Sequence, residues 1–227
     1  MYIDYYYIVL ILPCIILSSI AQMMVTSTFS KYSKLMSQRG FTGAQVARKI
    51  LDLNGLTHVT VEMVRGSLTD HYDPVKKVIR LSESVYSSSS VASLGVAAHE
   101  TGHAIQHATG YIPVKLRTFV FPLVSISSRI SLPLALLGLI LGFPSLVQFG
   151  IILFAVVVLF QIITLPVEFN ASRRALRILE DTAILADAEV SMASKVLRAA
   201  ALTYVASAIM AAMNLLRLIL IANNRRR

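Results

Sequence analysis

Residues 146–166 read LVQFGIILFAVVVLFQIITLP and contain no charged side chain. An apolar run of about 20 residues, wound as a helix, matches the roughly 30 Å hydrocarbon core of a bilayer. Residues 5–25 are also free of charge. Two further apolar stretches contain few charges: 120–142 has Arg129, and 196–222 has Arg198 near one end and Arg217 near the other. The sequence therefore predicts a mainly α-helical integral membrane protein with about four transmembrane helices.

The overall composition agrees with this prediction. The chain of 227 residues is 56% hydrophobic and 15% charged, with a mean hydropathy of +0.68, whereas soluble domains are about 25% charged. We interpret the net charge of +9 as lysine and arginine held on the cytoplasmic side, beside anionic lipid. The basic residues form no stripe interleaved with aromatic residues, so no nucleic-acid partner is expected.

One polar segment, residues 27–117, is expected to form a small α+β domain. Thr42 and Gln45 have the spacing of a capping box, and Gly55 is placed to end the helix that follows. A serine run then precedes an alanine-rich stretch, which is typical of a helix start. The predicted elements are a helix after Thr42, strands near 59–63 and 78–81, a turn at Asp73-Pro74, and a helix at 91–108.

The predicted helix at 91–108 carries His99, Glu100 and His103. Residues four apart share one face of a helix, so both imidazoles can bind one ion, and Glu100 is close enough to take a proton from water. The alternative is an ordinary helix decorated with these residues, but an unpartnered buried glutamate is costly. Cys14 is the only cysteine, so any metal must be held by histidine and carboxylate.

A catalytic zinc ion normally takes three protein ligands, so a third must be found. His107 is about 12 Å from His99 along an ideal helix, too far for both to bind one ion. Gln106 and Thr109 occupy positions where the metzincin pattern has glycine and histidine. Glu168 is the better candidate, because the preceding apolar hairpin returns the chain to the side where His99 lies. A charged residue that merely flanks a membrane helix is the alternative.

These features divide the chain into five predicted segments. They are an N-terminal transmembrane anchor at 1–26, a domain with the H-E-x-x-H helix at 27–117, a transmembrane hairpin at 118–166, an active-site helix and connector at 167–195, and a C-terminal transmembrane helix with a basic tail at 196–227. Lysine and arginine favour the cytoplasmic side for 27–117 and 167–195. The basic tail would then lie outside, so either the last segment does not span or the earlier charges set the orientation.

Three runs carry a resemblance to a known family: LTDHYDP at 68–74, AHETGHAIQH at 98–107 and TLPVEFNASRRAL at 164–176. Together they resemble the YugP-type zinc membrane metallopeptidases of bacteria, over nearly the whole chain. The layout is also similar to a compact relative of the HtpX and CaaX-prenyl endopeptidases, which place a membrane hairpin between H-E-x-x-H and a ligand glutamate. The resemblance implies a zincin-like domain of the gluzincin type, one Zn²⁺ per chain, Glu168 as third ligand, and a multi-pass protein of the bacterial cytoplasmic membrane.

The resemblance has two departures. HtpX-like enzymes have aspartate where this chain has Ser172, and YugP-type sequences often have aspartate where it has Asn170. An acidic group that orients a metal-bound histidine is therefore weaker here or supplied by another residue. The candidates for such contacts, or for contacts with substrate, are His107, Asn170, Ser172, Arg173, Asp70, Asp181 and Asp187.

The expected reaction is hydrolysis of peptide bonds in membrane proteins or peptides, with Glu100 as the base. Tyr204 and His71 are the candidate donors to the oxyanion. The alternatives are a catalytically silent zinc-binding scaffold or regulator of membrane protein quality control, and a small transporter. An intact Glu100 argues against the scaffold, and the lack of ionisable residues in 146–166 argues against the transporter.

Overall fold

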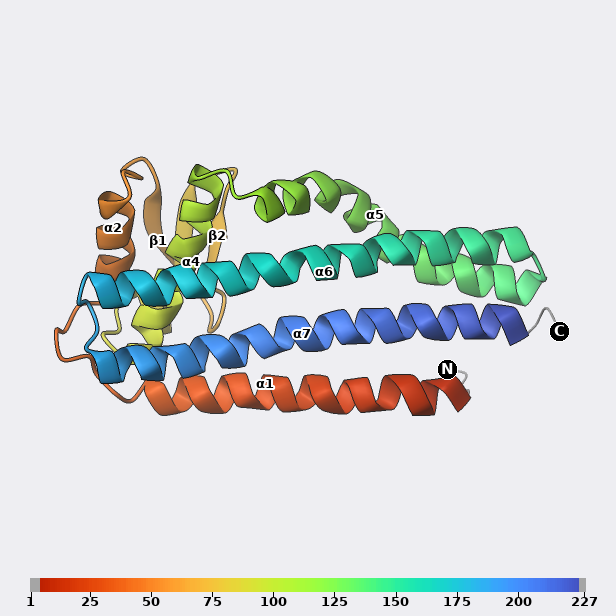
Figure 1. The fold of residues 1–227 in the computed structure, drawn as a ribbon, viewed down its shortest axis with the longest axis horizontal. Coiled ribbons are helices and arrows are strands. Elements are labelled where there is room, and N and C mark those ends of the chain that lie inside the picture. The colour runs from red at the N-terminus through yellow and green to blue at the C-terminus, as the bar shows by residue number, and fades with distance from the viewer. Residues whose placement is uncertain (1–4, 225–227) are drawn as a thin grey trace. The chain divides into compact units, whose positions relative to one another are not determined.

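The computed structural model describes residues 5–224 and is mainly helical (Figure 1). The chain divides into two compact units. The apolar unit contains the residues up to Ala21, Lys115–Pro166, and the residues from Leu202 onward. The polar unit contains Gln22–Val114 and Val167–Ala201.

Within residues 5–224, four helices are long and apolar enough to cross a membrane. They are η1 (Tyr7–Ile11) with its continuation α1 (Leu12–Tyr32), α5 (Ile112–Leu141), α6 (Pro144–Asp181) and α7 (Asp187–Asn224). These helices contain the four apolar stretches identified in the sequence, so the predicted fold class is confirmed. The predicted basic tail, Arg225–Arg227, lies outside the described residues.

The apolar unit contains a tight hairpin between α5 and α6. Gly142 has a φ of +71°, a left-handed conformation that glycine adopts without strain. The N–H of Phe143 donates to the carbonyl of Gly138 at 2.9 Å and closes the end of α5. A Cβ on Gly150 would come within 2.8 Å of the Ser131 carbonyl oxygen, so the two helices are closer than a larger residue would allow.

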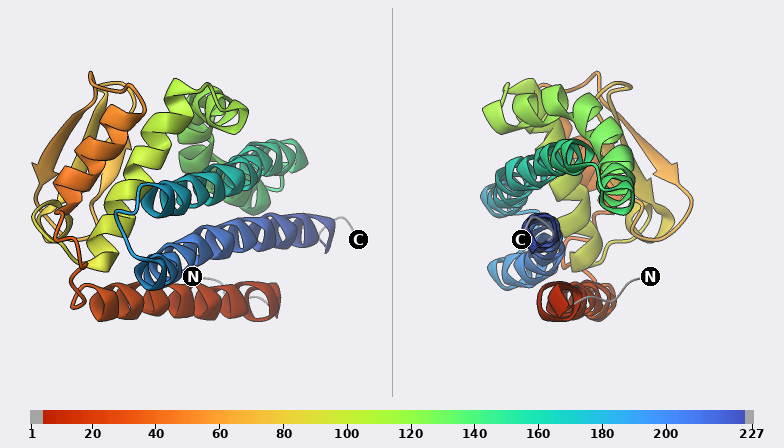
Figure 2. Two further views of the ribbon diagram at one scale, coloured as in Figure 1. Left: turned by 60° about the vertical axis from the view of Figure 1, so that its left-hand side comes forward. Right: turned by 90° about the vertical axis from the view of Figure 1, so that its right-hand side faces the viewer.

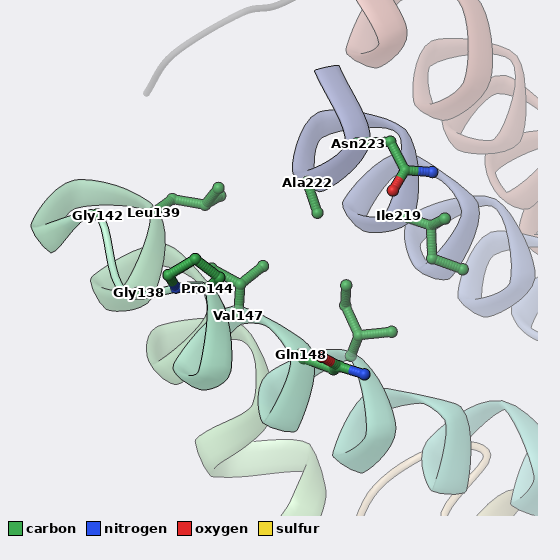
Figure 3. A pocket seen from close by; sticks show the side chains of 10 residues that line it. Gly138, Leu139, Gly142, Pro144, Val147, Gln148, Ile219, Ala222 and Asn223 are labelled. Atoms are coloured by element: carbon green, nitrogen blue, oxygen red, sulfur yellow. The ribbon is translucent and has the colours of Figure 1, made fainter. Parts of the chain in front are cut away.

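The apolar unit also contains an open cavity of about 340 Å³, between the ends of α5 and α7 and the beginning of α6 (Figure 3). Its lining combines apolar side chains with two amides, Gln148 and Asn223. None of the described lining residues is a histidine, cysteine or carboxylate. This cavity therefore offers no side chain of the kind that binds catalytic zinc.

Helix α6 crosses Pro166, the last residue of the predicted transmembrane hairpin at 118–166. The predicted active-site helix and connector begin at the next residue, Val167, although proline usually breaks or kinks a helix. In the structure α6 continues through Pro166 to Asp181. Val167, Ala171 and Ala175 belong to the polar unit and are fully buried. Packing within this unit therefore keeps the turns after the proline helical.

The polar unit begins its helices where the sequence predicts. The hydroxyl of Thr42 accepts from the N–H of Gln45 at 3.3 Å, and the Gln45 side chain accepts from the N–H of Thr42 at 2.9 Å, which confirms the capping box of α2 (Gly43–Leu53). The hydroxyl of Ser90 accepts from the N–H of Ser93 at 3.2 Å. This cap begins α4 (Val91–Ala108) and confirms the predicted helix at 91–108.

A three-stranded mixed sheet lies beside these helices. Its strands are β1 (Thr60–Val64), β2 (His71–Asp73) and β3 (Val78–Ser82), in the order β1-β3-β2, with β1 parallel and β2 antiparallel to β3. Strands β1 and β3 are predicted by the sequence, whereas residues 71–73 are not assigned to a strand. Strand β2 is short and forms by pairing with β3. Such pairing cannot be predicted from the local sequence pattern.

The helices α2 and α4 cover one face of the sheet (Figure 2). Ile79 and Leu81 of β3 are fully buried in the core between the sheet and these helices. The short helix α3 (Glu83–Tyr86) follows β3 and precedes α4. Arg80 points to the opposite face, where it pairs with Asp73 at 3.3 Å. The C-terminal part of α6, including the fully buried Leu179, completes the same core. The segment after Pro166 is therefore part of the domain that carries the H-E-x-x-H helix.

Candidate metal centre

Helix α4 presents His99 and His103 on one face. The two residues lie one turn apart, and their rings pack edge-to-face with centroids 4.7 Å apart. Their Nε2 atoms are 3.2 Å apart. The side chains expose only 14% and 15% of their surface. Two ring nitrogens thus converge on one point inside the polar unit.

Glu168 of α6 supplies a carboxylate at this point. Its Oε2 lies 3.4 Å from the Nε2 atoms of both His99 and His103, and its side chain is 4% exposed. The approach depends on Gly102, since a Cβ at this position would lie 2.7 Å from the carbonyl oxygen of Ala171. Glycine at this position of the motif therefore lets the backbones of α4 and α6 come close together, so that the carboxylate of Glu168 reaches the two histidine rings.

Ser172 contacts the other side of His99. Its hydroxyl lies 3.1 Å from the Nδ1 of His99. Ser172 follows Glu168 by one helical turn, so both residues face α4. A hydroxyl thus lies behind His99, at the position where HtpX-like enzymes have aspartate, and it can orient the ring by accepting from Nδ1–H.

A chain of hydrogen bonds behind His103 ends at an arginine. The Nδ1 of His103 lies 3.0 Å from the Oε1 of Gln106. The Nε2 of Gln106 donates to the carbonyl of Val167 at 2.8 Å and to the Oδ1 of Asn170 at 3.0 Å. The Nε of Arg174 donates to the same Asn170 oxygen at 2.8 Å. This chain links α4 to α6 through a fully buried amide.

The donor and acceptor roles along this series of hydrogen bonds determine the tautomer of His103. An arginine can only donate, so Asn170 turns its oxygen toward Arg174 and toward the amide nitrogen of Gln106. Gln106 must then present its oxygen to His103, and the Nδ1 of His103 must carry a hydrogen. The lone pair of the neutral ring therefore lies on Nε2, the atom that faces Glu168.

The distances within the cluster fit a tetrahedral zinc ion. Ligands about 2.05 Å from a tetrahedral ion lie about 3.3 Å from one another, and the three edges here are 3.2, 3.4 and 3.4 Å. Neutral imidazole nitrogens and a carboxylate oxygen would repel one another at this separation unless a cation or proton lies between them. His99, His103 and Glu168 form the set of described residues that can hold a metal in this way.

Glu100 lies next to His99 on α4 and is 8% exposed. Its negative charge acts on His103. Burial alone lowers the pKa of His103, but the carboxylates of Glu168 and Glu100, together with Gln106, raise it above the ordinary value of 6.5 when no metal competes for the ring. A second carboxylate, distinct from that of Glu168, thus lies close enough to the cluster to interact with His103.

Two of the other predicted site residues have partners of their own. The ring of His107 packs against Tyr72, with centroids 5.6 Å apart, and His107 is not among the three residues that converge. The carboxylate of Asp70 accepts from the N–H of Ser82 at 2.7 Å and from its hydroxyl at 3.0 Å. Burial raises the pKa of Asp70, against the lowering effect of these hydrogen bonds. Asp70 therefore fixes the junction between β3 and α3.

The two candidate donors to the oxyanion, His71 and Tyr204, have different surroundings. The Nδ1 of His71 lies 2.8 Å from the carbonyl oxygen of Thr69, and its Nε2 lies 3.4 Å from a guanidinium nitrogen of Arg80. A neutral ring must use its single N–H on that carbonyl, so the structure does not favour His71 as a donor. Tyr204 belongs to the part of α7 within the apolar unit.

The remaining predicted residues lie on α6 and α7. Arg173 is exposed and lines a cavity with Arg174 and Arg177, while Asp181 and Asp187 lie at the last position of α6 and the first of α7. Gln106 is a residue of this site that the sequence alone does not predict. Its spacing, one turn after His103, is a signal that could have suggested it, but the partner on α6 becomes evident only in the folded chain.

Comparison with known proteins agrees with this geometry. The family model described as "Putative neutral zinc metallopeptidase" matches residues 7–223. The chain belongs to this family. A similar relative of this zinc metallopeptidase is the "Putative membrane protease YugP" of Bacillus subtilis (strain 168), which is 49% identical over 220 residues, covering 97% of this chain and 98% of the relative. No solved structure matches.

Proposed function

We propose that this zinc metallopeptidase is a membrane-embedded endopeptidase that hydrolyses peptide bonds of membrane proteins or peptides, with one Zn²⁺ per chain. The observation that carries the proposal is the triangle of His99, His103 and Glu168, with edges of 3.2–3.4 Å, beside the buried Glu100. These three residues would hold the zinc, which when bound activates water and polarises the scissile carbonyl.

The protein groups around the triangle have distinct roles in this reaction. Glu100 takes the proton of the attacking water and passes it to the nitrogen of the leaving amine, so the peptide bond breaks without a free amide anion. Ser172 and Gln106 hold the two imidazoles with Nε2 toward the ion. His71 is not retained as the donor to the oxyanion, because it uses its N–H on the carbonyl of Thr69.

The polar unit is proposed to face the cytoplasm. Lysine and arginine near the ends of membrane helices favour that side, and such residues flank the apolar parts of two helices. Lys31 and Lys34 lie at the end of α1, and Arg173, Arg174 and Arg177 lie after the apolar part of α6. The substrate would then be cut near the cytoplasmic membrane surface.

The experiment compares zinc content and proteolysis in wild type, Glu100→Gln and Glu180→Gln. Glu100→Gln removes the base and keeps the ligands, so zinc content should stay the same while cleavage of a broad peptide library falls by about 10²–10⁴-fold. Glu180→Gln is the matched control, because Glu180 is exposed on α6 outside the triangle. Equal cleavage by wild type and Glu100→Gln would contradict the proposed role.

The second candidate function is a zinc-binding scaffold without catalysis. It would be favoured by wild-type protein that contains zinc and cleaves no member of a broad library of membrane and soluble peptides. The carboxylate of Glu100 argues against it, since a structural zinc site needs four protein ligands and no base, whereas the described cluster provides three.

A further inference from the structure

Three arginines follow Glu168 on α6 and line one cavity of the polar unit. The cavity has a volume of about 430 Å³, and its lining consists of Arg173, Arg174 and Arg177 together with two asparagines, Asn54 and Asn170, and two isoleucines. None of these arginines forms an ion pair within residues 5–224. Three positive charges thus meet at one concave surface without a carboxylate to neutralise them.

Arg174 is held in position for a ligand. Its Nε donates to the Oδ1 of Asn170 at 2.8 Å, and its guanidinium lies 5.9 Å from the centre of the Tyr111 ring. These contacts fix the plane of the guanidinium, and its two terminal nitrogens make no hydrogen bond to the described part of the chain. A fixed guanidinium plane suits a ligand with two adjacent anionic oxygens, such as a phosphate.

Two of the arginines lie on the side of α6 opposite Glu168, while Ile105 of α4 and Asn170 line another part of the cavity. At 100° per residue, Arg173 and Arg177 are turned by about 140° and 180° from Glu168 around the helix axis. A peptide bond held at the triangle of His99, His103 and Glu168 therefore does not extend directly into this cavity. The occupant is a separate ligand and not the bond that is cut.

The position of the arginines along α6 suits a lipid headgroup. The apolar run ends at Pro166, and at 1.5 Å per residue Arg173 and Arg174 begin about 10 and 12 Å beyond it. The polar layer of a bilayer extends roughly 5–8 Å past the hydrocarbon on each side, and long arginine side chains can reach back toward it. Ile105 and Ile178 in the lining suit the less polar part of a lipid.

We propose that the arginine cavity binds the phosphate of an anionic membrane phospholipid. A free phosphate ion shares this chemistry, but the two isoleucines and the position on α6 favour the lipid. The proposal is independent of zinc and of the peptidase reaction. Binding by the Glu100→Gln protein should equal that of wild type, so failure of one proposal leaves the other intact.

The test measures lipid binding to the full chain in neutral detergent by native mass spectrometry. The ligands are a short-chain phosphatidylglycerol, a short-chain phosphatidylcholine and inorganic phosphate. Wild type should bind phosphatidylglycerol more tightly than either of the others. The double variant Arg173→Gln/Arg177→Gln should bind it about 25-fold more weakly, about five-fold for each arginine. Arg174 is left intact so that Asn170 and Gln106 keep their hydrogen bonds.

The matched control is Lys34→Gln/Lys76→Gln, which removes the same charge from exposed lysines that do not line the cavity. This control should change the affinity for phosphatidylglycerol less than about two-fold. Arg173→Lys/Arg177→Lys should retain an intermediate affinity, since lysine keeps the positive charge but lacks the planar guanidinium that makes two hydrogen bonds to a phosphate. Circular dichroism confirms that each variant is folded. Wild-type affinity in the arginine double variant would overturn the proposal. So would equal binding of phosphatidylcholine or of inorganic phosphate.

Discussion

His99 and His103 reach the same point but have different groups behind them. His99 has the hydroxyl of Ser172 at its Nδ1, and His103 has the amide oxygen of Gln106. The amide is fixed by two further hydrogen bonds, whereas a hydroxyl can rotate. The orientation of His99 is therefore less strictly determined, and Ser172 is the position where a substitution can strengthen or weaken the site.

Ser172→Ala should lower the zinc affinity by about 10-fold, because groups that orient metal-bound histidines contribute a factor of 10–100. Ser172→Asp should raise the affinity above that of wild type, since a carboxylate accepts more strongly from Nδ1–H. The measurement is competition for zinc with a chromophoric chelator. Unchanged affinity in Ser172→Ala would show that the 3.1 Å contact does not orient the ring.

The zinc affinity should also depend on pH through His103. Burial lowers its pKa, but Glu168 and Glu100 outweigh burial and raise it above 6.5. Below this raised pKa the proton stabilises the metal-free fold by pairing with Glu168. That contribution is complete below pH 6.5 and is lost as the pH rises through the raised value.

Zinc requires the unprotonated ring, so its apparent affinity should fall about 10-fold per pH unit below the raised pKa and level off above it. Chelator competition between about pH 5.5 and about pH 8.5 measures the slope. A flat affinity over the acidic half of this range would show that His103 does not exchange its proton for the metal.

Among the elements, the contact between α4 and α6 decides whether the ligands meet. Gly102→Ala would place a Cβ 2.7 Å from the carbonyl oxygen of Ala171, which must push α6 away from α4. We expect a loss of about 1–3 kcal/mol in the free energy of unfolding, although alanine favours a helix. The zinc affinity should fall as well, because Glu168 moves with α6. Urea unfolding and chelator competition measure the two effects.

Gly95→Ala is the control for this prediction. Gly95 lies on the same helix, but its Cβ would meet the Ala193 side chain at 3.3 Å and not the backbone of α6. The zinc affinity should stay at the wild-type value. If both variants lose zinc equally, the close approach at Gly102 is not what positions the carboxylate.

The sequence predicts the elements that depend on neighbours along the chain. The caps at Thr42 and Ser90 are local hydrogen bonds, so composition and spacing reveal them. Strand β2 depends on pairing with β3, and the sequence does not predict it. Of the cluster, the histidines follow from helical periodicity and Glu168 from the returning hairpin. The role of Gln106 in orienting His103 is not evident from the sequence, because it depends on the hydrogen bond from Gln106 to Asn170 of α6.

For the whole molecule, the metal centre joins two parts of the polar unit that are far apart in sequence. His99 and His103 belong to α4, Glu168 belongs to α6, and both helices contribute to one core. An ion held by both should stabilise the fold by its binding energy, about 4 kcal/mol when the free zinc is about 1,000 times the dissociation constant.

Removing zinc with a chelator should therefore lower the melting temperature of the polar unit, and adding zinc back should restore it. Melting in detergent can be followed by circular dichroism. Glu100→Gln keeps all three ligands and should show the same zinc-dependent shift, whereas His103→Ala should show almost none. An identical melting temperature with and without zinc in wild type would mean that the ion does not link the two helices.

The uninterrupted helix from Pro144 to Asp181 also restricts how the chain can change in length. Deleting one residue just before Glu168 would turn the carboxylate by about 100° relative to the apolar run and draw it about 1.5 Å along the axis. An insertion at Gly142–Phe143 would alter only a turn. Length differences among homologous chains are therefore expected in that turn and in surface loops, while the number of residues between Pro144 and Glu168 stays constant.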